Sequence, residues 1–88
     1  SMNKTGEYTM VNKNTIKIGQ AVKAIFRKHG RHTIVGIILD IYEDSKSICK
    51  TWISIHVTGG DECDPHVQWM VSHRINCLVP LCDILEAI

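Results

Sequence analysis

Apolar and polar residues alternate along much of this chain, with the period of two that is typical of β-strands. Residues 15–26 place apolar side chains at most even positions, with Lys17 and Lys23 between them. Residues 33–42 are rich in β-branched side chains, and residues 51–57 alternate again. We therefore predict strands over these three segments, with a bend at Gly19 and a bulge at Gly36.

The remaining third of the chain predicts two further strands and a turn. Residues 67–71 alternate, which favours a fourth strand that buries Trp69. Residues 77–79 form a predicted fifth strand that Pro80 ends, and residues 81–88 carry enough helix-forming residues for one short turn. Closing five short strands on one another removes the unpaired edges of a sheet. The predicted fold class is therefore mainly β, a five-stranded small barrel with a short helical turn near the C-terminus.

The predicted domain organisation is simple. Residues 1–14 are polar and predict a flexible N-terminal leader, in which Ser1-Met2 is typical of an expression remnant. A chain of 88 residues has room for one core only, so residues 15–88 are predicted to form a single domain. The glycine-containing polar segments 27–32 and 58–65 predict an extended hairpin loop and a second long loop.

Three stretches carry a resemblance to a known fold. In chain order, IGQAVKAIF, GIILDIYED and NCLVPLCDILEAI resemble the strands and the final Val-Pro-Leu turn of SH3-like barrels. The last stretch is also similar to the small plasmid-borne, trimethoprim-insensitive dihydrofolate reductases, SH3-like tetramers with a Val-Gln-Ile-Tyr site strand before a proline. Here the strand before Pro80 reads Asn-Cys-Leu-Val and lacks that Gln and Tyr. The resemblance therefore implies the fold and not the reductase activity.

Composition and cysteine use indicate a cytoplasmic protein. Hydrophobic residues make up 44% of the chain, and its mean hydropathy is −0.01. Its longest apolar run is far shorter than the roughly 18 residues of a membrane-spanning helix, so we expect no membrane partner. No secretory signal precedes the cysteines, which favours reduced thiols over a disulfide framework. They are Cys49, Cys63, Cys77 and Cys82.

Charge is distributed unevenly, although the net charge is only +1. Residues 1–39 carry seven Lys/Arg and one acid, whereas residues 40–88 carry three Lys/Arg and eight acids. Cations on one region of a fold neutralise nucleic-acid phosphates without reading the bases. The alternative is a solvated basic loop that keeps the protein soluble. The predicted nucleic-acid-binding residues are Lys17, Lys23, Arg27, Lys28 and Arg31.

A protein-interaction module is the competing hypothesis. Trp52 and His56 share the outward parity of their strand, so we predict them as partner-binding residues for an adaptor, a small inhibitor or self-association. The acidic segment 61–64 is a second surface that a partner would recognise. The alternative is that Trp52 is covered by its own chain. A small chain of this kind also fits an accessory protein of phage or mobile-element origin.

Metal binding and catalysis find little support. Cys63 and His66 have chelating spacing, with His73, Cys77 and Cys82 as further ligands, but no second closely spaced pair accompanies them. Glycine-rich phosphate loops, nucleophile elbows and His-Glu-x-x-His motifs are missing from the sequence. We therefore expect a non-enzymatic protein without a metal or cofactor.

Overall fold

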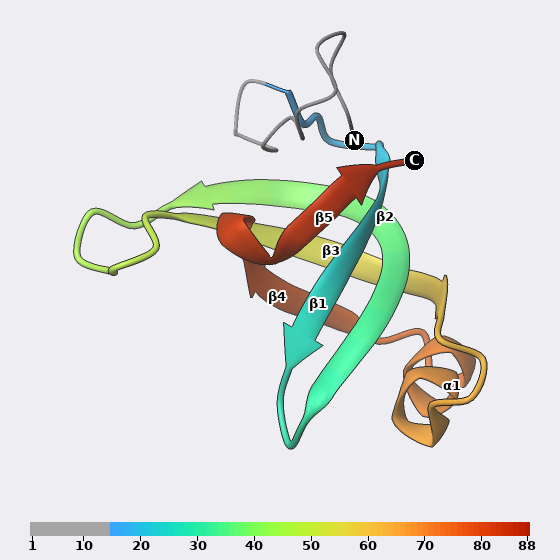
Figure 1. Ribbon diagram of the computed structural model, residues 1–88. Helices are drawn as coiled ribbons and strands as arrows, with labels where there is room; N and C mark the ends of the chain where they lie inside the picture. The colour runs from blue at the N-terminus through green and yellow to red at the C-terminus, as the bar shows by residue number, and fades with distance from the viewer. Residues whose placement is uncertain (1–14) are drawn as a thin grey trace, which may run out of the picture.

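The computed structural model describes residues 15–88, which form one antiparallel sheet, one α-helix and one 3-10 turn (Figure 1). In chain order the elements are β1 (Ala21–Arg27), β2 (Arg31–Glu43), β3 (Thr51–Gly60), α1 (Pro65–Ser72), β4 (Asn76–Pro80), η1 (Leu81–Asp83) and β5 (Ile84–Ala87). The strand order is β4-β3-β2-β1-β5. The domain is therefore mainly β, as the alternation predicts, and the leader predicted at residues 1–14 lies outside the described residues.

The sheet is bent, and the bend is centred on β2, which curves along its length in Figure 1. The ladder between β2 and β3 shifts register at Val35/Gly36 and again between Ile38 and Asp40. The first shift confirms the bulge predicted at Gly36. A side chain there would overlap the carbonyl oxygen of His56, so only glycine permits this close approach. Because of the bend, β4 lies beside β1 although the ladders leave these two strands unpaired.

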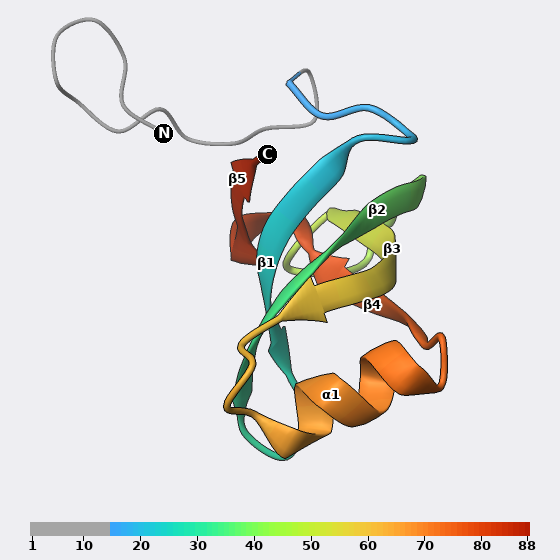
Figure 2. The ribbon, with the colours of Figure 1, turned by 90° about the vertical axis from the view of Figure 1, so that its right-hand side faces the viewer.

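The core fills the concave side of the bent sheet. Alternate residues of each strand point into it, as the period of two predicts. Its largest fully buried members come from β1, β2, β3, β4 and α1: Val22, Ile34, Ile38, Ile53, Ile55, Val57, Val67, Met70 and Val79. Helix α1 lies below the sheet in Figure 2 and covers one end of this core.

The predicted fourth strand is wrong, because its residues form α1. The Asp64 side chain caps the helix by accepting two backbone N–H groups of the first turn, and Pro65 occupies a first-turn position that needs no N–H donor. Val67 and Met70, three residues apart, are buried on one helix face. Trp69 points away from them and is 48% exposed, which corrects its prediction as a core residue. Within residues 15–88, every helix is too short or too polar to cross a membrane.

The C-terminal segment also differs from its prediction. Of the helical turn predicted over residues 81–88, only η1 is helical, and β5 follows it as an edge strand beside β1. The Ile88 N–H donates to the Ala21 carbonyl oxygen at 2.9 Å, just beyond the paired residues. The loop predicted over residues 58–65 is shorter than expected because β3 extends to Gly60.

Candidate functional site

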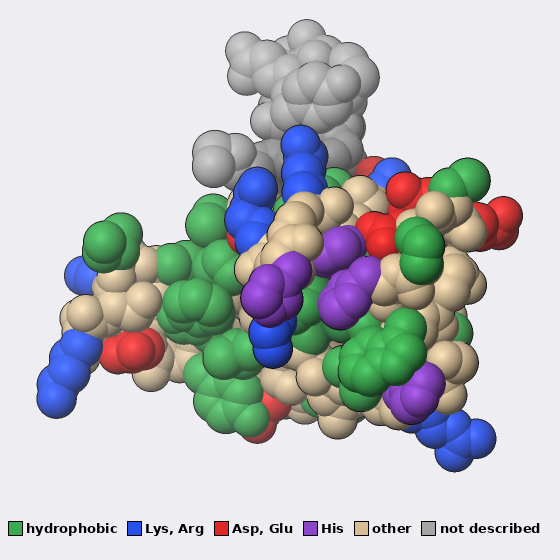
Figure 3. All heavy atoms as spheres, turned by 90° about the horizontal axis from the view of Figure 1, so that it is seen from below, with side chains coloured by type: hydrophobic (Ala, Val, Ile, Leu, Met, Phe, Trp, Pro, Cys, Tyr) green, Lys and Arg blue, Asp and Glu red, His purple; other side chains and the backbone are tan. Residues whose placement is uncertain are grey.

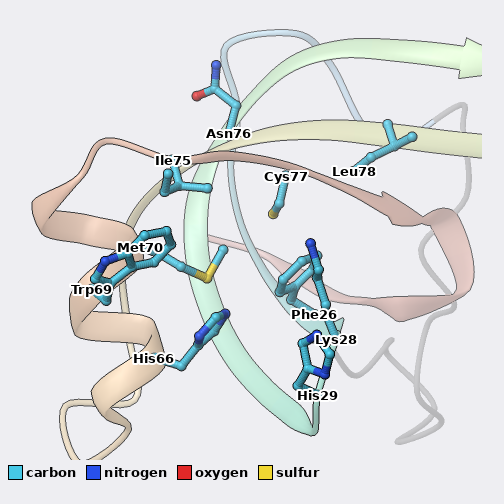
Figure 4. A pocket seen from close by; sticks show the side chains of 10 residues that line it. All are labelled: Phe26, Lys28, His29, His66, Trp69, Met70, Ile75, Asn76, Cys77 and Leu78. Carbon is cyan, nitrogen blue, oxygen red and sulfur yellow. The ribbon is translucent and has the colours of Figure 1, made fainter.

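A hollow of about 690 Å³ lies between the tip of the β1–β2 hairpin, α1 and β4 (Figure 4). Side chains from all three elements surround it in the close view. Its volume lies within the roughly 300–1,000 Å³ that small-ligand pockets occupy. The lining residues are Phe26, Lys28, His29, His66, Trp69, Met70, Ile75, Asn76, Cys77 and Leu78.

The hairpin side of this hollow depends on a tight turn. Arg27 and Arg31 are paired in the ladder, so the connection is only residues 28–30 and not the whole segment 27–32. His29 has φ 55° and Gly30 has φ 128°, left-handed values that reverse the chain within this short loop. The turn leaves Lys28 and His29 exposed at the hollow, held close to the end of a regular strand.

A row of rings, which we call the aromatic row, extends from β1 along the helix: Phe26, His66, Trp69 and His73. Residues 66, 69 and 73 share one face of α1 and its C-cap, because three or four residues make one helical turn. The His66 and Trp69 ring centroids are 5.9 Å apart, and those of Trp69 and His73 are 4.7 Å apart. Phe26 stacks on His66 at 6.5 Å. Figure 3 shows histidine and hydrophobic side chains gathered on the face seen from below.

One buried ion pair joins the two sides. His32 Nδ1 lies 2.7 Å from Asp64 Oδ2, and His32 Nε2 lies 3.1 Å from the Lys28 carbonyl oxygen. Both partners are acceptors, so the protonated ring, with an N–H on each nitrogen, satisfies both of them. The bond to Asp64 raises the pKa of His32 against the opposing effect of burial, and the same bond lowers the pKa of Asp64. Since Asp64 also caps α1, this pair links the start of β2 to the start of the helix.

The stability of the fold should depend on this pair. The raised pKa of His32 means that its contribution is complete below pH of about 6.5 and is lost as pH rises through the folded-state value. The lowered pKa of Asp64 means that its contribution is lost only as pH falls below about 4. We expect the wild type to have a smaller free energy of unfolding at about pH 8.5 than at about pH 5.5, measured by urea denaturation.

Asp64→Asn is the matched variant, because asparagine caps helices as well as aspartate but carries no charge. It should lose less stability than the wild type over the same pH interval. Equal losses in the two proteins would show that the His32–Asp64 pair does not cause the pH dependence.

Two of the five predicted phosphate-binding cations face acids of their own chain. The Arg27 Nε lies 3.2 Å from Asp83 Oδ2, and Lys23 is the cross-strand neighbour of Glu86 on β5. These acids belong to the C-terminal segment, whose position beside β1 was not predicted from the sequence. Arg27 is therefore partly neutralised by its ion pair, and Lys23 stands opposite an acid in the ladder.

The other three cations lie at opposite ends of β1, two at the hairpin and one at the far end. Lys28 lies in the hairpin turn and lines the hollow, and Arg31 directly follows the turn. Lys17 precedes the other end of β1, a strand of seven residues that spans about 23 Å. The structure thus brings Lys28 and Arg31 together and leaves Lys17 at the far end of the sheet.

The predicted partner-binding residues lie on the face of β3 that points away from the core. Trp52 is half-buried between Tyr42 and Pro80 in the ladders, and its Nε1–H donates to Ser47 Oγ at 3.3 Å. A smaller hollow of about 230 Å³ adjoins it. His56 lies further along the strand, with Nδ1 2.7 Å from Asn76 Oδ1 (Asn76 being a residue of the larger hollow).

The side chains considered as metal ligands in the sequence analysis do not form a metal site. Over residues 15–88, no group of three or more His, Cys, Asp or Glu side chains is placed to hold a metal ion. Cys63 is exposed, whereas Cys77 is buried and its burial raises the pKa of the thiol to about 11.

Comparison of the chain with protein families, curated proteins and solved structures gives no match. Its function is therefore argued from the geometry of its own residues. The feature that the sequence prediction missed is the aromatic row, because residues 67–71 were interpreted as a strand. The Asp64-Pro65 pair, a helix cap followed by proline, was the signal for it.

Proposed function

We propose that this domain is a non-enzymatic module that binds single-stranded nucleic acid. Bases would stack in the hollow on the aromatic row, and phosphates would bind at Lys28 and Arg31. The observation that carries the proposal is Trp69, a large ring that is 48% exposed and lines the same hollow as Lys28. Aromatic rings with basic neighbours are how proteins bind unpaired bases and their backbone.

Several features of the site favour a single strand over a duplex. The hollow is enclosed on three sides by the hairpin, α1 and β4, so an unpaired base fits it better than the edge of a double helix. Stacking needs the face of a base, which a duplex hides. Lys28 lines the hollow and Arg31 directly follows the same hairpin turn, where they would bind the phosphates that flank a bound base.

We also infer that the bent sheet belongs to the SH3-like barrels. The order β4-β3-β2-β1-β5, with a 3-10 turn between β4 and β5, supports this inference together with the position of β4 beside β1. In an SH3-like barrel, the bend at Gly36 would curve β2 so that its two halves pack on opposite sides of the core.

Fluorescence anisotropy of labelled oligonucleotides tests the function. Single- and double-stranded DNA and RNA of arbitrary sequence are titrated at low and at near-physiological salt. We expect micromolar affinity for single strands at low salt, a steep fall with salt and weaker binding of duplexes. Absence of binding at low salt, or a preference for duplexes, would overturn the proposal.

Removal of the two hairpin cations should flatten the salt dependence. The Lys28→Ala/Arg31→Ala double variant is expected to bind more weakly, and the slope of log K against log salt should decrease by about 1.4, because each phosphate contact to a single strand contributes about 0.7. The Lys46→Ala/Lys50→Ala double variant removes the same charge from exposed positions in the β2–β3 loop. It should keep the wild-type slope, and equal slopes in the two double variants would exclude a specific role for the hairpin.

The surface around Trp52 favours a second candidate, a protein-binding module. Tyr42 and Leu78 are each 49% exposed there and line the smaller hollow with Trp52. Buried tryptophans often dominate protein interfaces. This second function is supported if no oligonucleotide binds and if sedimentation of the wild type shows self-association that Trp52→Ala removes.

A further inference from the structure

Two of the four cysteines lie side by side although the chain separates them widely. Cys49 belongs to the connection between β2 and β3, and Cys82 belongs to η1. Their Sγ atoms are 4.0 Å apart. Cys82 is exposed and Cys49 is half-buried, so a small molecule in solvent reaches the pair from the Cys82 side.

We propose that Cys49 and Cys82 are a redox-sensitive modification site, forming a reversible intramolecular disulfide on reaction with a small-molecule disulfide such as oxidised glutathione. This site is separate from the larger hollow and the aromatic row, so its test is independent of the proposed nucleic-acid binding.

The geometry requires only a small movement. A disulfide places the two sulfur atoms about 2.05 Å apart, so the gap must close by about 2 Å. Rotation of a cysteine side chain to another staggered rotamer moves its sulfur by a comparable distance. Cys49 lies next to a hydrogen bond from the Asp44 N–H to the Lys50 carbonyl oxygen at 2.6 Å, which closes the loop that carries it. The backbone on that side is therefore held in place while the side chains turn.

The two thiols differ in how readily they ionise. Burial alone would raise the pKa of Cys49, but hydrogen bonds with the Cys82 backbone and thiol outweigh it and lower that pKa below its ordinary value. Burial and the neighbouring Cys49 raise the pKa of Cys82. The thiolate is the species that attacks a disulfide, so Cys49 is the better nucleophile of the pair.

The reaction is a two-step exchange. The Cys49 thiolate attacks one sulfur of oxidised glutathione, a new S–S bond forms, and one glutathione thiolate leaves and takes a proton from water. Cys82 then loses its proton to water and attacks the Cys49 sulfur of the mixed disulfide, which releases the second glutathione. Overall, two cysteine thiols are oxidised to one disulfide and one oxidised glutathione is reduced to two thiols.

The cross-link would act on the smaller hollow. Ser47, which accepts the hydrogen bond from Trp52, lies in the same connecting segment as Cys49. Tying that segment to η1 restricts the loop that forms one side of this hollow. The oxidised protein should therefore unfold at a higher temperature than the reduced one, since the bond also constrains the unfolded chain.

The experiment uses the full chain. Reduced, folded protein is incubated with excess oxidised glutathione, quenched with acid, alkylated and analysed by mass spectrometry with peptide mapping. We expect loss of two hydrogen atoms from the mass, two alkylated thiols in place of four, and a peptide containing Cys49 linked to one containing Cys82. Treatment of the oxidised protein with a reducing agent before alkylation should restore four free thiols.

Cys63→Ser is the matched control, because Cys63 is exposed like Cys82 but belongs to another loop. It should form the same cross-link as the wild type. Cys49→Ser and Cys82→Ser should each lose the cross-link, and the remaining thiol of the pair should retain one glutathione. A wild type that stays reduced, that pairs through Cys63 or that forms only intermolecular disulfides would overturn the proposal.

Discussion

Replacing Trp69 with alanine is expected to weaken binding of single-stranded nucleic acid by about 5- to 140-fold. This range corresponds to about 1–3 kcal/mol, the usual contribution of one base stacked on an aromatic side chain. Trp69 is half-exposed and contacts His66 and His73 at the surface, so its removal should cost little stability. Anisotropy titration at low salt measures the affinity, and urea denaturation shows that the variant is folded.

Trp52→Ala is the control, since Trp52 lines the smaller hollow and not the larger one. Its affinity for the oligonucleotide should stay within about twofold of the wild type. The salt slope of Trp69→Ala should also match that of the wild type, because stacking releases no counterions. If Trp52→Ala weakens binding more than Trp69→Ala, the bases do not stack in the larger hollow.

Gly36→Ala is expected to lower the free energy of unfolding by about 3 kcal/mol or more, the upper range for adding a methyl group to a packed interior. The new Cβ would overlap the His56 carbonyl oxygen and the Ile55 Cγ2. The first of these is backbone in the central ladder, which cannot move without separating β2 from β3. For a small domain with about 5–15 kcal/mol of stability, such a loss is a large share. Chemical denaturation measures it.

Gly59→Ala provides a matched control on the partner strand. Gly59 is the ladder partner of Val35, beside the same register shift, but a Cβ there meets no atom within 4 Å. Alanine at this position should change stability by less than about 1 kcal/mol, since only the entropy of the unfolded chain is affected. Similar losses in both variants would mean that flexibility of the bulge, and not space at Gly36, makes glycine necessary.

The strands were predictable where burial on one side imposes alternation. In β3 the buried residues fall at every second position, because that strand has the core on one face only, whereas in β1 Ile25 is buried in addition to Val22 and Ala24. The bulge at Gly36 was predictable for a related reason, as glycine inside an apolar run indicates close backbone approach. The short strand β5 was missed because four residues are too few to show a period.

Helix α1 was not predicted because the strand period and the helix period both fit the same short segment. Val67 and Val71 satisfy alternation, while Val67, Met70 and Val71 equally satisfy the spacing of a helix face. The local capping signal at Asp64 and Pro65 decides between them. The helix ends in the same local way, with Arg74 at φ 53° and the Ile75 N–H donating to the Met70 carbonyl oxygen at 2.9 Å.

The candidate site was predicted only in part. The charge pattern indicated Lys28 and Arg31, which the structure places beside the hollow and at its hairpin. It also indicated Arg27 and Lys23, whose acidic neighbours come from β5 and the turn before it. Such neighbours are separated from β1 by most of the chain, so no local pattern reveals them. The aromatic row depended on the helix and was lost with it.

The pairing of β5 with β1 also constrains how the sheet is completed. The hairpins β1–β2 and β2–β3 join neighbours in the chain and need only short loops to close, whereas the β1–β5 ladder joins Val22 to Ala87. On the ribosome, the outer edge of β1 therefore stays open until the last strand has been made. Open edges recruit other chains. Charged side chains on an edge strand disfavour such pairing, and β1 carries two, Lys23 and Arg27.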